Sequence, residues 1–466
     1  MKATSLSTDY LIVGAGAVGM AFADTLLTDT KDDIIIVDRH HMPGGHWNVA
    51  YPFVTLHQPS AFYGVSSTEL SNGKIDQVGL NKGLGNLASG AEVRAYFDNV
   101  MSHRFLPSGR VRYFPMCNYI GEGKFESLLT GEVHTVSFRK HVDATYLKTT
   151  VPSTHVPGFS IADSVQFMPL NDLPRITRKP EGYVIIGGGK TGIDACLWLL
   201  ENNVDPDTIR WIMPRDGWLL DRKNTQAGVD FFEFTMGAQA AQFEAIAQST
   251  SVDDLFQRLE KAGVLQRIDK DVKPQMFHGA TVSQAELTEL RRIKNVIRMG
   301  RVQSIGETRI ILDEGELKTS PDIIHIDCSA SAISNLETKP IFQGDLITPQ
   351  TVRSYQPVFS ASLVAHVEAT RDTEKEKNEL CGVVPLPNHD TDWIRMMIPF
   401  MMNQYQWSRD KELREWLANN RLDGFSEMVR NIREDDKEKQ AILQRLRDNS
   451  MPAMAMLHQL VAELDE

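Results

Sequence analysis

Two glycine clusters carry the clearest chemistry in this sequence. The first lies in the stretch YLIVGAGAVGM and has the spacing G-x-G-x-x-G at Gly14, Gly16 and Gly19. The second lies in VIIGGGKTGIDA and repeats that spacing at Gly187, Gly189 and Gly192. In such a loop the glycines permit a tight turn, the approach of a pyrophosphate to the backbone, and close packing of the next helix on the strand. Because the helix start adds N–H groups and partial positive charge, each loop is predicted to bind a dinucleotide.

The residue that closes the next strand differs between the two loops. Asp38 stands 24 positions after the first glycine of the first loop, where a carboxylate accepts hydrogen bonds from ribose hydroxyls, and Arg39 beside it is a further cofactor-binding candidate. Arg215 stands 28 positions after the first glycine of the second loop. A guanidinium there binds a 2′-phosphate, which a carboxylate would repel. The pattern favours NADPH over NADH, although the negative charge of Asp216 next to Arg215 weakens this preference. The alternative interpretation is that Arg215 is a solvated arginine in a surface turn.

Two different loops imply two different nucleotides. A nicotinamide carries a hydride, and a flavin accepts it and passes the electrons on. We therefore expect FAD at the N-terminal loop and NADP, as NADPH, at the internal loop. Lys190 and Thr191 lie within the internal loop and are candidates for that cofactor, with Lys190 adding positive charge near the phosphates.

Strands and helices at the expected places must hold these loops. Apolar runs predict buried strands over 9–13, 34–37 and 208–213 and a further strand beginning at Tyr183, and the periodicity predicts a helix over 17–28 and another over 91–105. Alternating residues between 110 and 147 are typical of antiparallel strands. The segment 43–90 is rich in Gly, Ser, Asn and Pro, and a loop-rich segment of that length is more often functional than idle.

The order of these segments predicts an α/β fold with two Rossmann-like dinucleotide-binding domains, the second inserted in the first. The expected boundaries are 1–160 and 328–380 for the FAD-binding domain and 161–327 for the NAD(P)H-binding domain. A helical insert is expected over about 225–295, and a helical C-terminal region over 381–466. The Met and Trp residues of that region are most simply core, but such a surface also suits a substrate or a second subunit of a homo-oligomer (Trp393, Met396, Met397, Met401, Met402 and Trp407).

Bulk composition excludes several classes of protein. The 466 residues carry a formal net charge of -12, which argues against a nucleic-acid partner held by a general positive field. The four cysteines are scattered, so neither a C-x-x-C redox motif nor a metal site is predicted, and this pattern fits a reducing compartment. The apolar run near the N-terminus resembles a signal peptide only superficially, since it contains the patterned glycines, and Met396–Met402 is too short for a membrane span. We expect a cytoplasmic protein without a membrane partner.

Beyond Asp38 the sequence resembles the two-dinucleotide flavoproteins, and within them the flavin-containing and Baeyer–Villiger monooxygenases. The stretch DRHHMPGGHWNVAYPFVTLHQPS is similar to that group's segment of an acid, Gly-Gly-x-Trp, Tyr-Pro and a polar stretch beside the flavin. The resemblance implies that Gly44, Gly45 and Trp47 pack along the FAD, with His57, Gln58 and Ser60 near its isoalloxazine ring.

Two later stretches match that group less closely. PDIIHIDCSASA is similar to the strand that returns the chain to the FAD domain, and IFQGDLITPQTVR contains Gly344-Asp345, which implies a position of Asp345 near the flavin ribityl and pyrophosphate. An Asp in a Gly-Asp turn is by default a turn former. The Baeyer–Villiger fingerprint F-x-G-x-x-x-H-x-x-x-W is absent before the second loop, which argues against ester formation from ketones.

These features predict an FAD-dependent, NADPH-consuming oxidoreductase, and most simply a monooxygenase. It would insert oxygen from O2 into a small, partly apolar organic substrate through a C4a-(hydro)peroxyflavin, with His57, Gln58 or the nicotinamide amide as donor. One alternative is a flavin reductase or dehydrogenase that passes electrons from NAD(P)H to an organic or protein acceptor. The other is a non-catalytic nucleotide-binding protein that senses redox state.

Overall fold

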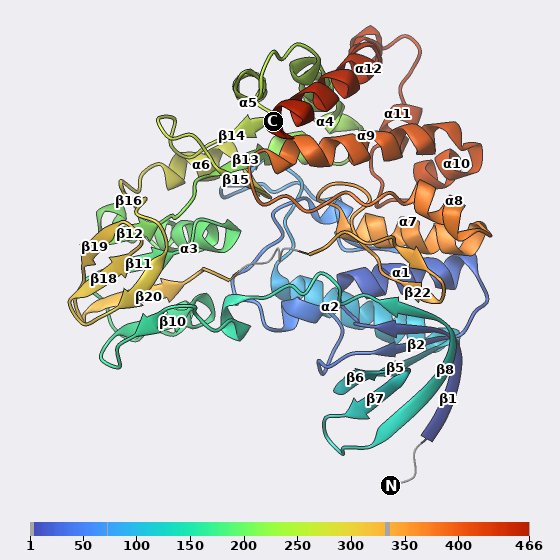
Figure 1. Cartoon of the computed structure of the whole chain (residues 1–466), viewed down its shortest axis with the longest axis horizontal. Coiled ribbons are helices and arrows are strands. Elements are labelled where there is room, and N and C mark those ends of the chain that lie inside the picture. Colours follow the sequence, from blue (N-terminus) through green and yellow to red (C-terminus); the bar gives the residue numbers. More distant parts are fainter. Residues whose placement is uncertain (1–3, 72, 331–335, 466) are drawn as a thin grey trace.

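Two sheets, well apart in the molecule, hold the two glycine loops after central strands that pair in parallel with their neighbours (Figure 1). The computed structural model describes residues 4–71, 73–330 and 336–465, so the last residues of the stretch PDIIHIDCSASA lie outside the described residues. Each glycine loop follows the central strand of its sheet, at the carboxyl end, as the two Rossmann-like units predicted from the sequence require. The α/β fold class is therefore confirmed.

The first sheet is built around the N-terminal strand. Its strand order is β21-β22-β8-β1-β2-β5, and β6 and β7 extend it from β8. The strands span β1 Thr4–Val13, β2 Ile34–Val37, β5 Val111–Phe114, β6 Cys117–Gly121, β7 Lys124–Ser127, β8 Val133–Asp143, β21 Phe342–Gln343 and β22 Leu346–Ile347. Strand β2 is buried on both faces, because Ile34 and Ile36 join one core and Ile35 and Val37 join another.

Helices cover one face of this sheet and a β-meander covers the other. Helices α1 (Ala17–Asp29), α2 (Gly90–Val100) and α7 (Pro357–Thr370) share the core that contains Ile34 and Ile36. A short π-helical turn, η3 (Met101–Phe105), extends α2. Phe125 of β7 packs on the opposite face with Ile35. The expectation of antiparallel strands over 110–147 is wrong for β5 and for the β1–β8 pairing, which are parallel, and holds for β6, β7 and the start of β8.

The second sheet is fully parallel, with the order β10-β20-β11-β12-β16. Its strands span β10 Gln166–Pro169, β11 Gly182–Ile186, β12 Ile209–Ile212, β16 Asn295–Ile297 and β20 Ile323–Asp327. Helices α3 (Lys190–Glu201) and α6 (Gln284–Leu290) pack on one face. A small sheet covers the other with β9 Ser160–Ile161, β17 Val302–Ile305, β18 Arg309–Leu312 and β19 Gly315–Lys318.

The insert differs from the expected all-helical segment. Helices α4 (Phe232–Ala247) and α5 (Val252–Lys261) are present, but residues 264–282 do not continue them. Instead β13 (Gly217–Asp221), β14 (Leu265–Gln266) and β15 (Met276–Val282) form a three-stranded sheet. The helical pattern stops at Gly263, whose φ of +71° lies in the left-handed region that ends helices.

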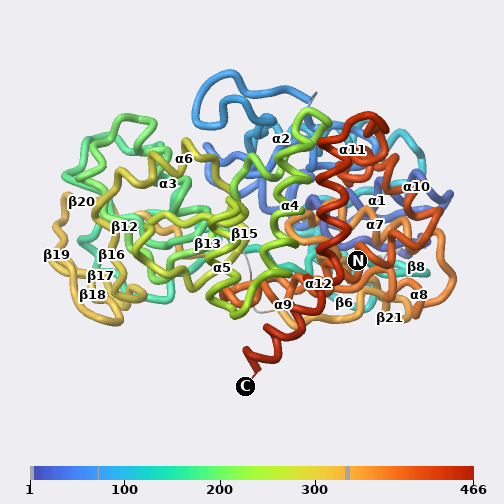
Figure 2. Tube along the Cα trace, turned by 90° about the horizontal axis from the view of Figure 1, so that it is seen from above, coloured from blue at the N-terminus to red at the C-terminus, as the bar shows by residue number. Residues whose placement is uncertain are grey.

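The C-terminal region, expected to be helical over 381–466, has no helix over 381–391 and contains four helices from residue 392 onward within the described residues. Its helices are α9 Asp392–Arg409, α10 Lys411–Asn419, α11 Ser426–Arg430 and α12 Lys437–Asp465, preceded by the short α8 Glu374–Leu380. Helices α12 and α4 lie side by side (Figure 2), joined by an ion pair of 2.5 Å between Arg445 and Glu244. Trp393, Met396 and Met397 are buried, as a core role requires, whereas Met402 is 51% exposed and is not core.

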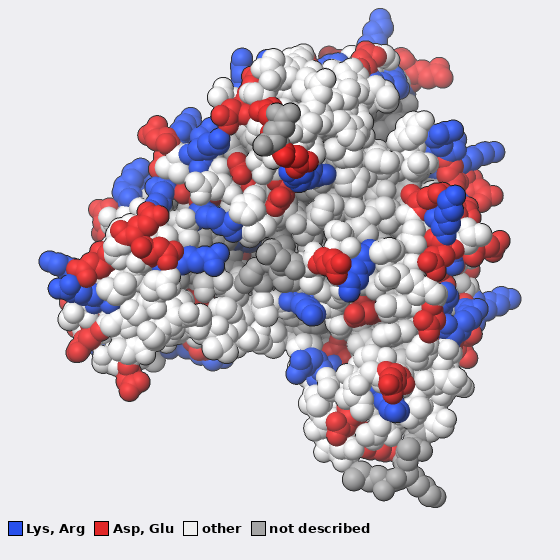
Figure 3. Space-filling model, in the orientation of Figure 1, with Lys and Arg blue, Asp and Glu red and all other residues white. Residues whose placement is uncertain are grey.

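The surface and the loop-rich segment complete the fold. On the face of Figure 3, acidic and basic side chains are interspersed rather than gathered into a region of one sign. Among the described residues, no helix combines the length and apolar character that crossing a bilayer requires. Residues 43–90 are mostly irregular, with short 3-10 turns η1 (Gly45–Asn48) and η2 (Ser60–Phe62) and the small hairpin of β3 (Gly64–Val65) and β4 (Thr68–Glu69).

Candidate functional site

The first glycine loop connects β1 to α1 in a conformation that only glycine adopts readily. Gly14 has a φ of +104°, and a Cβ on Gly19 would overlap the carbonyl oxygen of Gly14. Gly16 caps the start of α1, with neither a side-chain cap nor an acidic residue in the first turn. The first N–H groups of α1 therefore have no side chain to satisfy them, which suits a phosphate.

Asp38 ties this loop to the end of β2. Its Oδ2 accepts a hydrogen bond from the Ala15 N–H at 2.5 Å, and its Oδ1 accepts one from the His40 N–H at 2.7 Å. The side chain is buried and holds the loop against the strand, and ribose binding by Asp38 stays a prediction. Arg39 is exposed and makes no hydrogen bond or ion pair with the described residues.

Gly44 and Gly45 bring the next segment against the glycine loop. The Gly44 N–H donates to the Ala15 carbonyl at 2.9 Å, and a Cβ on Gly45 would lie 2.9 Å from the Gly16 Cα. Trp47 is buried, and its indole N–H donates to the Tyr63 hydroxyl at 2.7 Å. Gly45 thus reaches the predicted pyrophosphate site, whereas Trp47 has the core position that its residue type favours.

The second glycine loop repeats the geometry of the first. Gly187 has a φ of +128°, and a Cβ on Gly192 would overlap the Gly187 carbonyl oxygen. Gly189 has open space, with no atom within 4 Å of an added Cβ, and it caps α3 without a side-chain bond. Helices α4, α7, α9 and α11 also lack a side-chain cap, so the glycine conformations, and not the missing cap alone, distinguish the two loops. The residues of both loops therefore fit a dinucleotide.

Lys190 is the first residue of α3, and it is not free in the loop. It forms an ion pair with Asp194 one turn later, and the Tyr51 hydroxyl donates to the other oxygen of that carboxylate at 2.5 Å. Tyr51 belongs to the loop-rich segment after the first nucleotide unit, so this group joins the two units directly. Thr191 lies in the first turn of α3, partly buried.

Arg215 lies against the second loop at the end of β12, where the sequence places it. Its carbonyl oxygen lies 3.0 Å from an added Cβ on Gly188, and its Nη2 donates to Asn388 Oδ1 at 2.9 Å. Burial lowers the pKa of Arg215, and the charge of Arg301 lowers it further. Asp216 does not offset this charge, because Arg298 binds its carboxylate through two hydrogen bonds of 2.7 and 3.0 Å.

His57 lies between the second unit and the insert. Its Nδ1 accepts the Thr281 N–H at 3.2 Å, so a neutral ring carries its proton on Nε2. Burial lowers the pKa of His57 to about 3, with further contributions from the charges of Lys190 and Arg222. Arg222 also donates to the His57 carbonyl at 3.1 Å. His57 is therefore a neutral N–H donor at ordinary pH.

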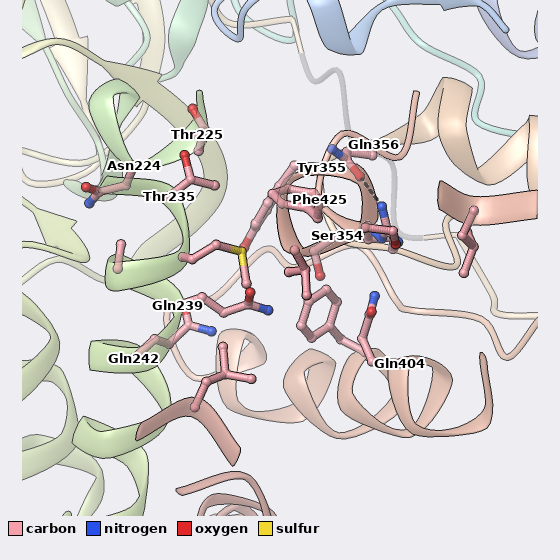
Figure 4. A pocket seen from close by; sticks show the side chains of 18 of the residues that line it. Asn224, Thr225, Thr235, Gln239, Gln242, Ser354, Tyr355, Gln356, Gln404 and Phe425 are labelled. Atoms are coloured by element: carbon pink, nitrogen blue, oxygen red, sulfur yellow. Dashed lines mark hydrogen bonds between the residues drawn. The ribbon is translucent and has the colours of Figure 1, made fainter. Parts of the chain in front are cut away.

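Gln58 lines a cavity of about 950 Å³ between the insert and the C-terminal helices. The side chains of Gln239 and Gln242 on α4 and of Gln404 on α9 extend into the same space (Figure 4). Gln58 was predicted from the sequence, whereas these three amides were not. In the sequence, these glutamines stand out only as polar residues on helix faces that are otherwise apolar. That pattern does not identify a site, because the sequence does not show that the two helices lie next to each other.

The structure does not bring Asp345 together with the glycine loops. The residue is exposed in the turn between β21 and β22, and its carbonyl accepts the His141 N–H at 2.8 Å. Strand β22 starts after Asp345 and runs parallel to β8, so Asp345 lies at the amino end of β22, and the loops lie toward the carboxyl ends. The turn-forming role of a Gly-Asp pair is the one observed, with Gly344 at a φ of +64°.

Comparison with known proteins finds close relatives in mycobacteria. A protein of Mycobacterium tuberculosis and one of Mycobacterium bovis, both described as uncharacterized, are each 47% identical over 427 residues, which cover 92% of this chain and 79% of theirs. No protein-family model matches the chain.

Solved structures give more distant similarities. A flavin-containing monooxygenase from Stenotrophomonas maltophilia is 13% identical, covering 81% of this chain and 100% of that one, with a TM-score of 0.45. An oxidized steroid monooxygenase bound to NADP is 15% identical, covering 78% of this chain and 85% of that one, with a TM-score of 0.47.

Proposed function

We propose that this chain, which belongs to the same family as these mycobacterial proteins, is an FAD-dependent, NADPH-consuming oxidoreductase, and specifically a monooxygenase of small organic substrates. One observation carries the proposal. Helices α1 and α3 each follow a glycine loop at the carboxyl end of a parallel strand, and the next strands are followed by residues of opposite charge, Asp38 and Arg215. Two such sites in one chain are suited to two dinucleotides with different roles.

The second site favours NADPH through its own residues. Arg215 has a neutral partner in Asn388, and Arg298 pairs with the carboxylate of Asp216. A guanidinium whose hydrogen-bond partner is a neutral amide suits a 2′-phosphate, which the planar fork of arginine binds through two parallel hydrogen bonds.

The first site favours FAD through the loop and the segment that follows it. Gly16 and Gly45 approach each other closely, so backbone N–H groups from both sides are available to a pyrophosphate. When bound, a flavin accepts hydride from a nicotinamide and supplies the redox chemistry with O2 that the side chains of a protein lack.

The chain's own residues between the two sites orient the reaction. Neutral His57 presents an Nε2–H, and Arg222 and Thr281 fix its backbone and ring. Gln58 follows His57 in the chain and lines the apolar cavity, where a substrate would be held away from water. Exclusion of water matters for an oxygenase because it prevents loss of reactive intermediates to solvent.

Oxygen transfer is the test that separates this proposal from its rivals. The purified protein is incubated with NADPH, isotopically labelled O2 and an apolar sulfide such as methyl phenyl sulfide, and the sulfoxide is analysed by mass spectrometry. A monooxygenase places labelled oxygen in the product. A reductase oxidises NADPH with an artificial electron acceptor and leaves the sulfide unchanged, and a redox regulator oxidises no NADPH in either assay.

A further inference from the structure

We propose that the cavity between the insert and the C-terminal helices binds an elongated apolar molecule that carries an anionic group, of the long-chain carboxylate class. The proposal names a substrate class and in that respect rests on the proposed function. The cavity has a volume of about 950 Å³, at the upper end of the range for small-molecule sites, so an extended ligand fits it.

The walls of the cavity are apolar and match the apolar body of the proposed ligand. Helices α4 and α9 contribute Met236, Phe243, Met397 and Phe400, and α11 is preceded by Phe425. Methionine side chains adapt to flexible chains because they are unbranched and polarizable. An alkyl chain is therefore a better match for these walls than a rigid polar molecule.

Two charged groups inside the cavity, Asp221 and Arg353, already have hydrogen-bond partners. The carboxylate of Asp221 accepts from the Lys223 N–H at 3.1 Å and from Gln284 Nε2 at 2.7 Å. The guanidinium of Arg353 forms a buried ion pair of 2.6 Å with Asp423. The neutral donors leave the negative charge of Asp221 uncancelled, so this carboxylate repels an anionic group. Asp423 balances the charge of Arg353, although the Arg353 Nε–H has no hydrogen-bond partner among the described residues. The interior therefore favours the apolar body of a ligand.

Free charge is found instead on α10 at the rim of the cavity. Lys411 and Arg414 line the cavity, are exposed, and make no ion pair with the described residues. Arg430, also on the rim, donates to the neutral Asn419 at 3.0 Å, and Glu415 is the acidic residue beside them. The rim therefore carries an excess of positive charge in a chain whose formal net charge is -12.

This local excess points to an anion rather than a cation or a neutral group. A field from the whole chain would repel anions, so the rim cations form an exception that favours a negative ligand group within about 10 Å of them. The neutral amides of Gln239 and Gln404, which make no hydrogen bond with the described residues, do not discriminate by charge.

Binding of three matched probes tests the inference. Dodecanoate, dodecan-1-ol and dodecyltrimethylammonium have the same chain and differ in the charge of the head group, and titration calorimetry on the full-length protein measures the affinity of each. We expect dodecanoate to bind at least about fivefold more tightly than the alcohol at low ionic strength, with the difference shrinking as salt is added. The ammonium compound is expected to bind most weakly.

Variants assign the effect to the rim and the cavity. Lys411→Gln/Arg414→Gln is expected to weaken dodecanoate about fivefold and to leave dodecan-1-ol unchanged. Lys31→Gln/Lys179→Gln removes the same charge from exposed positions that do not line the cavity, and should leave both affinities unchanged. Ala238→Trp, which fills the cavity from α4, should weaken both ligands.

Equal affinity of the acid and the alcohol, or tighter binding of the ammonium compound, would overturn the inference. Unchanged affinities in Ala238→Trp would show that the ligands bind elsewhere and would overturn it equally. These measurements need no turnover. A failure of the proposed redox function would appear as absent oxygen transfer, independently of which probe binds.

Discussion

The carboxylate of Asp216 and the guanidinium of Arg298 form a two-point ion pair, with an Nε–Oδ2 distance of 2.7 Å and an Nη2–Oδ1 distance of 3.0 Å. Asp216 is 7% exposed, so the pair is largely removed from solvent. The neighbouring Arg215 donates to the neutral Asn388, so no carboxylate of the described residues is hydrogen-bonded to its guanidinium. The acid that seemed to moderate the second site in the sequence is instead bound to another arginine.

Reversing the charge at Arg215 should reverse the preference for the cofactor. Arg215→Glu removes charge-assisted hydrogen bonds and adds repulsion toward the 2′-phosphate, so the affinity for NADPH should fall about tenfold to a hundredfold. The affinity for NADH should stay the same or rise. Titration of both nucleotides by quenching of protein fluorescence measures the change, and an unaltered preference would refute the role of Arg215.

Removing Arg298, the ion-pair partner of Asp216, should also lower the affinity for NADPH, but by less than Arg215→Glu does. Arg298→Gln leaves the carboxylate near Arg215 uncompensated, so the affinity for NADPH should drop roughly threefold to tenfold. Arg309→Gln is a matched control, because Arg309 forms an exposed ion pair of 2.7 Å with Glu316 away from the loop. Equal losses in both variants would mean that the effect is one of general charge.

One added methyl group in either glycine loop should abolish the binding of one cofactor and preserve the binding of the other. Because a Cβ on Gly19 or Gly192 would overlap a loop carbonyl, Gly→Ala at either position forces the loop to shift, at a cost of about 1–3 kcal/mol. Gly192→Ala should keep its flavin and lose NADPH binding. Gly19→Ala should purify without flavin and still bind NADPH.

The visible spectrum and nucleotide titration of each variant check this pattern, and thermal melting verifies that both remain folded. Loss of the flavin in Gly192→Ala together with loss of NADPH binding in Gly19→Ala would exchange the two sites and contradict the assignment.

His57 should contribute a pH dependence to stability. Burial lowers its pKa to about 3, below the ordinary value of 6.5, so between these values the unfolded chain binds the proton and the native chain does not. Stability therefore falls as pH decreases through this window, with a slope of at most about 1.4 kcal/mol per pH unit from this residue.

Replacement of His57 removes that contribution. Urea unfolding between about pH 5 and pH 7.5 should show a shallower slope for His57→Gln than for the wild type. His103→Gln, at an exposed position, serves as control and should keep the wild-type slope. An identical slope in all three proteins would mean that His57 titrates normally.

Local signals allowed much of the nucleotide framework to be predicted. Strand β2 was predicted with its observed bounds because four β-branched residues stand between a helix and an acid. The clash positions Gly19 and Gly192 follow from the third glycine of each motif, since that glycine lets the helix pack against the strand. The Lys190–Asp194 pair was also available from the sequence, as an i, i+4 relationship at a helix start, but was not inferred.

Features that depend on long-range contacts were not predictable. The helical pattern of α5 appeared to continue into Leu265, which instead pairs with β13. Asp216 and Arg298 lie 82 positions apart, so nothing local indicated that they meet. The cavity exists only because α4 packs beside α9 and α12, helices that are separated from it by more than a hundred residues in the chain.

Anaerobic mixing of the purified protein with NADPH tests the central claim most directly. We predict that the protein carries FAD, and that NADPH bleaches the visible absorbance of the flavin faster than NADH does at equal concentration. A protein that carries no flavin, or a flavin that stays oxidised in the presence of NADPH, would contradict electron flow from the loop at Gly187 to the loop at Gly14.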